Sequence, residues 1–371
     1  MTLLATYRRD YSRVMERSRS RKILIALGLV LFALAVLLLT QSDLLTKPRF
    51  VQFSGVNISG AEITPTQVPG MHGTHYIYPD NSMIDYFATK GMNIIRLAVL
   101  WERLQHRQGV NLDDAEMQRI DAVIGYAGSK GMKVILDVHN FAEYLGAVIG
   151  TEKLPTAALA DLWRQIATRY KDNATVIFGL MNEPKGLPTE TWLQAANLSI
   201  AQIRQAGAQN LILVPGNGWS SARDWTSAIY GTPNADVMLK VVDPSKNIAF
   251  EVHQFFDQDF TGTRAECQNV DVGVGSLKQF TQWARKNGKR GFMGEFGVGE
   301  NQQCLETLDR VLKYMSDNND VWLGWTYWAA GSWWPKNYFT SVEPLDGKDR
   351  VQMTILEKYI GLAGSSRKDA K

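Results

Sequence analysis

The sequence predicts an α/β protein, a (β/α)8 TIM barrel preceded by one N-terminal transmembrane helix. Short apolar runs rich in β-branched residues alternate with longer amphipathic stretches, and most of the runs are apolar throughout, as strands of a buried parallel sheet are. Eight such runs interleave with helical stretches over about 310 residues, and this number and length favour a closed barrel. A charge-free apolar stretch near the N-terminus predicts the membrane helix.

The first forty residues have the charge pattern of a membrane anchor. Residues 1–22 carry seven basic and two acidic side chains, whereas Ile23–Leu39 carries no charged or strongly polar one. These seventeen residues span about 25 Å of lipid bilayer as a helix, and the basic flank predicts that residues 1–22 stay in the cytoplasm. A cleaved signal peptide is the alternative. In either case we expect the rest of the chain outside the cytoplasm, either held in the cell membrane by a single span or secreted.

The chain is expected to contain one large domain and several short segments. We predict a basic cytoplasmic segment at 1–22, an anchor or signal segment at 23–40, a short tether at 41–49, the barrel at 50–363 and a polar tail at 364–371. Beyond residue 22 the chain has 33 basic and 35 acidic side chains, so it offers no general basic field for nucleic acid. The five histidines show no metal-ligand spacing, and no metal or other cofactor is expected.

The elements of the barrel are predicted in chain order. The strands are Val51–Asn57, Asn93–Val99, Lys133–Val138, Val176–Met181, Leu211–Pro215, Ile248–His253, Gly291–Glu295 and Val321–Trp328. Amphipathic segments between them predict helices at Asp113–Ser129, Thr156–Tyr170, Thr189–Ala206, Gly275–Asn287 and Cys304–Asp317. An open doubly wound sheet is the rival architecture. It is disfavoured because Gly55–Gly60 does not lead directly into a helix, as a phosphate-binding loop would.

Polar side chains stand at the carboxyl ends of these strands, which is the end where barrel enzymes build their active sites. Glu183 follows the fourth strand and Glu295 ends the seventh. The other polar residues at such positions are Asn57, Arg96, His139, Asn140, Asn182 and His253. Asn57 and Asn140 are candidates for contact with sugar hydroxyls, with loop capping as an equal alternative for each. A buried carboxylate is costly unless it is paired, so two of them in this company indicate a catalytic site.

Two carboxyl groups facing each other are what the cleavage of a glycosidic bond requires. One protonates the leaving oxygen while the other meets the reacting carbon, and in retaining enzymes they stand about 5–5.5 Å apart. Tryptophans support a sugar substrate, because the flat C–H faces of sugars stack on indole rings. Trp328 lies in the last predicted strand, and Trp333 and Trp334 follow in a loop rich in Gly, Ser and Pro. Packing is the alternative role for these rings.

Two motifs resemble a known family. Asn182-Glu183-Pro184 and Gly294-Glu295-Phe296-Gly297, in this order and spacing, resemble glycoside hydrolase family five (cellulase family A) over roughly residues 50–360. Further stretches are similar to the fungal-type endo-β-1,4-glucanases of that family: Val252–Gln254, Gly262–Cys267 and Trp328–Trp334. The resemblance implies a retaining endo-β-1,4-glucanase (cellulase) that hydrolyses internal bonds of β-glucan through a covalent glycosyl-enzyme. The alternatives are a β-mannanase, a mixed-linkage β-glucanase and a non-catalytic carbohydrate-binding barrel.

The resemblance also implies a role for each residue of the site. Glu183 is expected to be the acid/base and Glu295 the nucleophile, with Arg96 paired to Glu295 and lowering its pKa. Asn182 is expected to bind the 2-hydroxyl of the sugar under attack. The remaining expected roles are site support by His139 and His253 and a hydrophobic floor by Trp328.

One position departs from the family pattern. The family has H-x-Y after the sixth strand, with the tyrosine hydroxyl donating to the nucleophile, whereas this chain has Phe255. A lost hydrogen bond to a charged group costs about 1.5–3 kcal/mol, and Tyr327 is a candidate substitute donor.

The two cysteines, Cys267 and Cys304, are able to form one disulfide, with two buried free thiols as the alternative. The fungal-type subgroup supports the pairing.

Overall fold

The computed structural model describes residues 28, 30, 32 and 50–361. Residues Met1–Arg49 and Phe50–Lys371 form separate compact units, and the following account concerns the second of them. The segments predicted at 1–22, 23–40, 41–49 and 364–371 fall on residues outside the described ones, apart from Gly28, Val30 and Phe32. Among the described residues, no helix has both the length and the apolar character that crossing a membrane requires.

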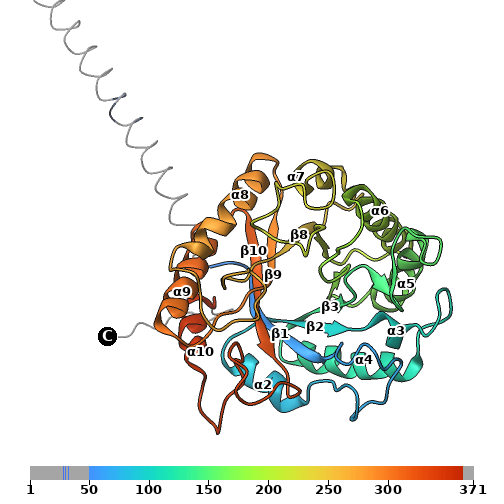
Figure 1. The fold of residues 1–371 in the computed structure, drawn as a ribbon, viewed down its shortest axis with the longest axis horizontal. Helices are drawn as coiled ribbons and strands as arrows, with labels where there is room; N and C mark the ends of the chain where they lie inside the picture. Colours follow the sequence, from blue (N-terminus) through green and yellow to red (C-terminus); the bar gives the residue numbers. More distant parts are fainter. Residues whose placement is uncertain (1–27, 29, 31, 33–49, 362–371) are drawn as a thin grey trace, which may run out of the picture. The chain divides into compact units, whose positions relative to one another are not determined.

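Eight parallel strands close into a barrel, as predicted (Figure 1). They are β1 Phe53–Ala61, β2 Ile94–Val99, β3 Lys133–Val138, β6 Val176–Gly179, β7 Ile212–Pro215, β8 Ile248–His253, β9 Gly291–Glu295 and β10 Trp322–Ala330. Each strand pairs with its neighbour in chain order, and β10 closes the barrel on β1, with Phe53 opposite Gly324. The eight predicted runs are thus the eight barrel strands, with small differences at their ends.

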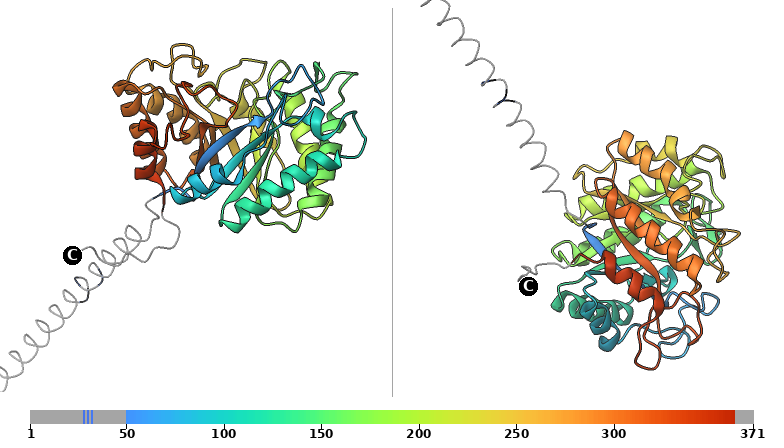
Figure 2. Two further views of the ribbon diagram at one scale, coloured as in Figure 1. Left: turned by 90° about the horizontal axis from the view of Figure 1, so that it is seen from below. Right: turned by 90° about the vertical axis from the view of Figure 1, so that its left-hand side faces the viewer.

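Helices cover the outside of the strands, as Figures 1 and 2 show. They are α2 Asn81–Thr89, α3 Trp101–Leu104, α4 Asp114–Ser129, α5 Thr156–Tyr170, α6 Thr189–Gln205, α7 Asn234–Val237, α8 Val272–Lys286, α9 Gln302–Asp317 and α10 Val351–Leu356, with 3-10 turns η1 Met238–Lys240 and η2 Glu357–Tyr359. A small hairpin, β4 Glu143–Tyr144 and β5 Ala147–Val148, follows β3. The five predicted helices are confirmed. Helices α2, α3, α7 and α10 were not predicted; the first turn of α2 is capped by Asp80, which accepts from the N–H of Met83.

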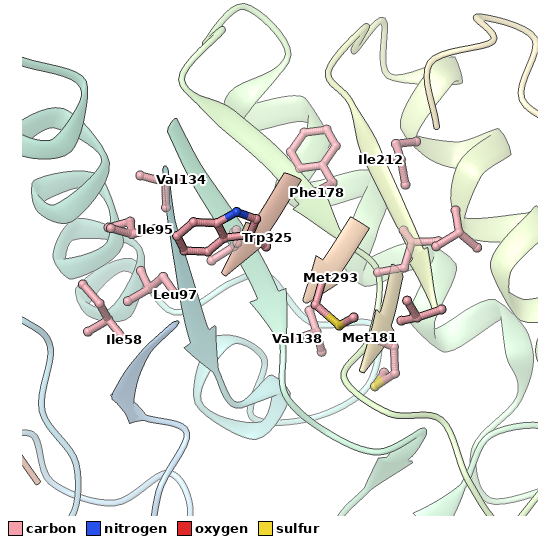
Figure 3. Packing of buried hydrophobic residues seen from close by; sticks show 14 of the residues in the cluster. Ile58, Ile95, Leu97, Val134, Val138, Phe178, Met181, Ile212, Met293 and Trp325 are labelled. Atoms are coloured by element: carbon pink, nitrogen blue, oxygen red, sulfur yellow. The ribbon is translucent and has the colours of Figure 1, made fainter. Parts of the chain in front are cut away.

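The barrel has an apolar layer on each side of its wall. Outside it, strand residues such as Ile95, Val134 and Phe178 belong to the large cluster under the helices (Figure 3). Inside, a second cluster takes one residue from each strand: Phe53, Ile94, Ile135, Ile177, Leu213, Ala249, Phe292 and Leu323. These residues lie near the amino ends of their strands. They therefore close the end of the barrel opposite to the strands' carboxyl ends.

Two positions further along three of the strands, the inner wall becomes charged. Because strand side chains alternate between faces, Arg96 on β2, Asp137 on β3 and Glu251 on β8 point inward above the apolar layer. All three are fully buried. The barrel thus places an ionic layer directly beneath the carboxyl ends of its strands.

The predicted disulfide is confirmed. Cys267 and Cys304 are bonded, with their Cα atoms 5.3 Å apart. The bond joins the loop after β8 to the first turn of α9, where Asn301 caps the helix by accepting from the N–H of Cys304. It therefore fixes the long loop that follows His253.

Candidate active site

Glu183 and Glu295 come together at the carboxyl ends of the strands. Glu295 is the last residue of β9, and Glu183 lies in the turn after β6 with a left-handed φ of 42°. One carboxylate oxygen of each lies within 4.8 Å of the other and of a ring nitrogen of His253. Glu295 is buried, whereas the side chain of Glu183 is 16% exposed. One carboxyl group is therefore enclosed in the barrel while the other faces the opening.

Arg96 lies at the centre of the ionic layer. Its guanidinium is fully buried and contacts three carboxylates on three other strands: Nη1 lies 2.8 Å from Oε1 of Glu295, Nε 2.9 Å from Oε1 of Glu251 and Nη2 3.0 Å from Oδ1 of Asp137. Only Glu295 had been predicted as a partner. The charge of one arginine is thus shared between the predicted nucleophile and two carboxylates that the sequence analysis did not single out.

Two asparagines complete the surroundings of Arg96. Asn57 accepts a hydrogen bond from Nη1 at 3.0 Å and Asn182 one from Nη2 at 2.8 Å. The amide nitrogen of Asn57 donates to the carbonyls of Gly294 and Thr326. Both ends of the Asn57 amide are therefore used inside the barrel, which favours a structural role for it over the predicted contact with sugar.

Both site histidines are paired with a carboxylate two residues earlier in the same strand. Nδ1 of His139 lies 2.8 Å from Oδ2 of Asp137, and Nε2 of His253 lies 3.2 Å from Oε1 of Glu251. The other nitrogen of His253, Nδ1, lies 2.8 Å from Oε1 of Glu183. Since both ring nitrogens of His253 face carboxylates, neither has a lone pair free for a metal ion. The trio of His253, Glu183 and Glu295 is therefore explained as a charge network.

These carboxylates govern the protonation of the histidines. Burial alone lowers the pKa of His253, but Glu295, Glu183 and Glu251 together raise it to about 10. His139 behaves in the same way: burial lowers its pKa and Asp137 raises it, with a net increase. The site thus carries positive charge on histidine at neutral pH.

The pKa of Glu295 corrects an expectation. Arg96 was expected to lower it, but burial raises the pKa of Glu295 more than the cations of His253 and Arg96 lower it. The guanidinium is divided among three carboxylates, and the nearby charge of Glu183 also raises the pKa of Glu295. Arg96 orients Glu295 but does not bring its pKa below the ordinary range.

Asn140 is engaged in the loop after β3. Its Oδ1 accepts from the N–H of Trp101 at 2.8 Å, and its Nδ2 donates to Oε2 of Glu102 at 2.7 Å and to the carbonyl of Glu143 at 3.2 Å. These bonds favour loop capping over the predicted contact with sugar hydroxyls. His139, one residue earlier, points into the site.

The predicted tryptophans lie at different depths. Trp328 stacks on His139 with ring centroids 5.9 Å apart, and its Nε1 donates to the hydroxyl of Tyr338 at 2.9 Å. Trp334 is half-buried and stacks on Tyr338 at 4.3 Å, so it supports the ring of Trp328 from the side. Trp333 is 40% exposed. Of these rings, Trp333 is therefore the most exposed, and Trp328 and Trp334 are half-buried.

Tyr327 does not replace the hydroxyl that Phe255 lacks. The Tyr327 hydroxyl donates to the carbonyl of Val298 at 3.1 Å and accepts from its N–H at 3.0 Å, within the loop after β9. The ring of Phe255 packs against Gly262, where an added Cβ would lie 2.5 Å from it. The suggestion that Tyr327 is the substitute donor was wrong, because its hydroxyl is already bonded in both directions.

An exposed aromatic ring beside the site was missed. Trp219, in the loop after β7, is 44% exposed and has a left-handed φ of 56°. Its ring lies 5.8 Å from that of Tyr230, and its main-chain N–H donates to the carbonyl of Pro184. The sequence signal was a tryptophan directly after Gly216-Asn217-Gly218 at a strand end.

A pocket adjoins the site at the loops after β1, β2 and β3. It has a volume of about 580 Å³ and is lined in part by His139. Its other lining residues include Glu62, Leu100, Glu102, Phe141 and Leu145. The pocket and Trp219 are therefore contributed by different sectors of the barrel mouth.

Comparison with known proteins gives matches along most of the barrel. The family described as "Cellulase (glycosyl hydrolase family 5)" matches residues 56–331. The endo-β-1,4-glucanase B of Aspergillus niger is 35% identical over 311 residues, which cover 83% of this chain and 90% of the relative. Among solved structures, an endo-β-1,4-glucanase of Xanthomonas axonopodis pv. citri is 46% identical, with a TM-score of 0.82 over 84% of this chain and 98% of its own. The structure of XacCel5A in complex with cellopentaose is 47% identical, with a TM-score of 0.82 over 83% and 99% of the two chains.

Proposed function

The chain belongs to glycosyl hydrolase family 5, the cellulase family, and is a glycoside hydrolase; from this premise we propose that it is a retaining endo-β-1,4-glucanase. The observation that carries the proposal is the approach of Glu183 and Glu295, whose nearest carboxylate oxygens lie within 4.8 Å. Retaining glycosidases hold their two carboxyl groups about 5–5.5 Å apart, whereas inverting ones need about 6.5–9.5 Å to admit a water. The short separation supports double displacement.

In the first step, Glu183 acts as the general acid and Glu295 as the nucleophile. Glu183 gives its proton to the glycosidic oxygen while a carboxylate oxygen of Glu295 bonds to the anomeric carbon, and the bond to the leaving sugar breaks. The partial exposure of Glu183 suits contact with the leaving group. The enclosed position of Glu295 suits a nucleophile that must be held in one orientation.

In the second step, Glu183 acts as the general base. It takes a proton from water, the water oxygen bonds to the anomeric carbon, and the ester bond to Glu295 breaks. The configuration at the anomeric carbon is inverted twice and therefore retained. Both residues return to their starting protonation, so no cofactor is needed.

The remaining residues bind and orient. Arg96 donates to Oε1 of Glu295 and so directs the other oxygen. Because the Oδ1 of Asn182 accepts from Arg96, its amide N–H groups are available to the 2-hydroxyl of the sugar under attack. His139 holds the ring of Trp328, which forms an apolar floor for that sugar. His253 supports both carboxylates.

The proposed substrate class is supported by the exposed aromatic rings and by the relatives. A solved relative binds cellopentaose, and curated relatives are endo-β-1,4-glucanases. We propose a β-1,4-glucan chain that passes the catalytic pair, with Trp219 and Trp333 stacking on its sugars. Action within the chain fits rings placed on different loops of an open barrel mouth.

The proposed location is outside the cytoplasm. The disulfide Cys267–Cys304 supports export, because such bonds persist in oxidising compartments. We propose that residues 1–22 stay in the cytoplasm and that 23–40 anchor the chain in the lipid bilayer, with 41–49 as the tether to the barrel at 50–363. Secretion after cleavage of the N-terminal segment is the alternative.

The experiment that tests the proposal is a panel of β-glycans. Reducing-sugar release is measured on carboxymethylcellulose, lichenan, laminarin and mannan, with Glu295→Ala as the inactive control. We expect release from carboxymethylcellulose and a rapid fall in its viscosity, which marks internal cleavage. Absence of release from every glycan would refute the hydrolase, and preference for mannan would identify a mannanase.

Two further measurements separate mechanism from binding. Proton NMR of the first products is expected to show the β-anomer, as retention requires. Glu183→Gln is expected to lose turnover on polysaccharide and keep affinity for it. An initial α-anomer would contradict the retaining mechanism.

A further inference from the structure

The same short pattern occurs on two barrel strands. Asp137-Val138-His139 ends at the carboxyl side of β3 and Glu251-Val252-His253 ends β8, each with an acid two residues before a histidine. Residues two apart in a strand share a face, so both acids and both histidines point into the barrel. Each acid contacts its histidine and also Arg96. The two acids therefore occupy equivalent positions on either side of one guanidinium.

The two patterns differ in the second contact that each histidine makes, beyond the acid of its own strand. His139 stacks on Trp328, whereas Nδ1 of His253 lies 2.8 Å from Oε1 of Glu183 and 3.8 Å from Oε2 of Glu295. The opposite nitrogen, Nε2, lies 3.2 Å from Oε1 of Glu251. Ionised carboxylates only accept hydrogen bonds, so a histidine between them carries a proton on both nitrogens. His253 is thus placed as a cation that hydrogen-bonds Glu183 and lies 3.8 Å from the nearer carboxylate oxygen of Glu295.

Room for this contact depends on Gly294. A Cβ at this position would lie 2.2 Å from Oε1 of Glu251 and 2.7 Å from Nε2 of His253. Any larger residue would push the acid and the histidine apart. The glycine directly before Glu295 therefore leaves the space that the Glu251–His253 pair occupies. This steric observation supports the pair independently of its charges.

The charged groups that surround His253 come from five strands or their following turns. Three face it directly: Glu251 on β8, Glu183 after β6 and Glu295 on β9. Asp137 on β3 interacts with it over a longer range, and Arg96 on β2 lies beyond Glu251. Carboxylates thus outnumber cations around this ring.

We propose that Glu251 is a positioning residue for the reaction: it holds a doubly protonated His253 between the two carboxylates, so that Nδ1–H orients Glu183 by a hydrogen bond and the ring places a positive charge 3.8 Å from Oε2 of Glu295. The inference rests on the proposed roles of Glu183 and Glu295. The Nδ1 proton is not transferred. The proton given to the leaving oxygen comes from Oε2 of Glu183, while Oε1 is held by His253.

The state of His253 is tested first, in the native full chain. The chain has five histidines, so imidazole-15N labelling gives few signals, and His253→Gln identifies the one of interest. We expect His253 to stay protonated beyond pH 9, consistent with the pKa of about 10 that its carboxylates impose. In Glu251→Gln it should titrate at least one pH unit lower. A native His253 that titrates near 6.5, or a variant with unchanged titration, would overturn the proposal.

The role in the reaction is tested by pH profiles of kcat. Glu251→Gln should lower kcat roughly 10- to 100-fold, as expected for a weakened hydrogen bond to a charged group, and move the alkaline limb to lower pH. The matched control is Asp137→Asn, which takes the equivalent carboxylate from Arg96 and leaves His253 in place. We expect its alkaline limb to stay where the native one is, and Glu251→Asp to recover part of the lost rate.

Equal shifts in Glu251→Gln and Asp137→Asn would mean that the effect passes through Arg96, and the proposal would fail. If Glu251→Gln does not fold, as judged by circular dichroism, the titration of His253 in the native chain decides. That titration needs no turnover. A native chain without glucanase activity would therefore refute the proposed function, and a neutral His253 would refute the positioning role.

Discussion

Trp219 and Pro184 are joined by a main-chain hydrogen bond of 3.2 Å, which ties the loop after β7 to the residue that follows Glu183. The bond holds the backbone of an exposed tryptophan next to the turn that carries Glu183, the proposed acid/base. We expect Trp219→Ala to raise KM for long glucans about 2- to 10-fold, since an aromatic contact contributes about 0.5–1.5 kcal/mol. Turnover of a small aryl glycoside should change little. Val242→Ala, an exposed apolar residue before β8, is the control and should leave both constants unchanged.

Phe255→Tyr is expected to raise kcat. Arg96 is the one side chain in the described part of the chain that donates to Glu295 within hydrogen-bond range, and a hydroxyl at position 255 would add a donor. The gain should be up to about 10-fold, the lower end for a hydrogen bond to a charged group. Tyr327→Phe is the control, because its hydroxyl serves Val298. If Tyr327→Phe lost rate and Phe255→Tyr did not gain it, this view of the nucleophile would be incorrect.

Removing the disulfide should lower the free energy of unfolding and leave kcat nearly unchanged. The bond spans a sequence separation of 37 residues, and the chain-entropy model gives about 4 kcal/mol for a loop of this size. We expect the Cys267→Ser, Cys304→Ser double variant to unfold at lower urea concentration, with kcat at low temperature near that of the native chain. A large loss of kcat without loss of stability would show that the bond shapes the site directly.

Stability should fall as the pH rises above neutral. The folded-state pKa of His253 is raised to about 10 from an ordinary value of 6.5, so between these values the folded chain holds one proton more than the unfolded chain. The resulting stabilisation is complete below pH 6.5 and is lost as pH rises through 10, with a slope of at most about 1.4 kcal/mol per pH unit. Urea midpoints from pH 7 to pH 10 measure it. In His253→Gln the slope should be smaller, and equal slopes would contradict the assignment.

The barrel was predictable because its strands are buried on both faces. A run such as Val176–Met181 has no polar side chain, and few other structures produce eight largely apolar runs between amphipathic helices. Strand ends were less certain, since β10 continues to Ala330 in a stretch without a breaking residue. Helix α2 was missed although Asp80, a typical N-cap, precedes it.

Within the site, side chains at strand ends were predictable and those one layer deeper were not. Asp137 and Glu251 were read as part of apolar strands, yet the alternation of side chains places them on the same face as His139 and His253. A carboxylate inside a buried strand was the unused signal. Asn140 was singled out, but its hydrogen bonds within the loop were not predictable. They depend on Glu102 and other loop atoms that are distant in the sequence.

Long-range neighbours were also beyond the sequence. Trp219 reads as a loop tryptophan, and its position beside Pro184 follows from how two loops meet above the barrel. The wrong expectation for Tyr327 has the same origin, since Tyr327 lies in β10 and its hydroxyl meets Val298 in the loop after β9.

The contacts of Arg96 have a consequence for how this enzyme can change. One guanidinium forms ion pairs with acids on β3, β8 and β9, so the centre that would break glycosidic bonds also links these strands across the barrel. Loss of a partner leaves a buried charge uncompensated, at a cost of about 3–5 kcal/mol. Heat inactivation should then coincide with global unfolding. New substrate preferences should therefore arise more readily from substitutions in the loops that carry Trp219 and Trp333 than from substitutions in the strands. Loop substitutions leave the ion pairs of Arg96 intact.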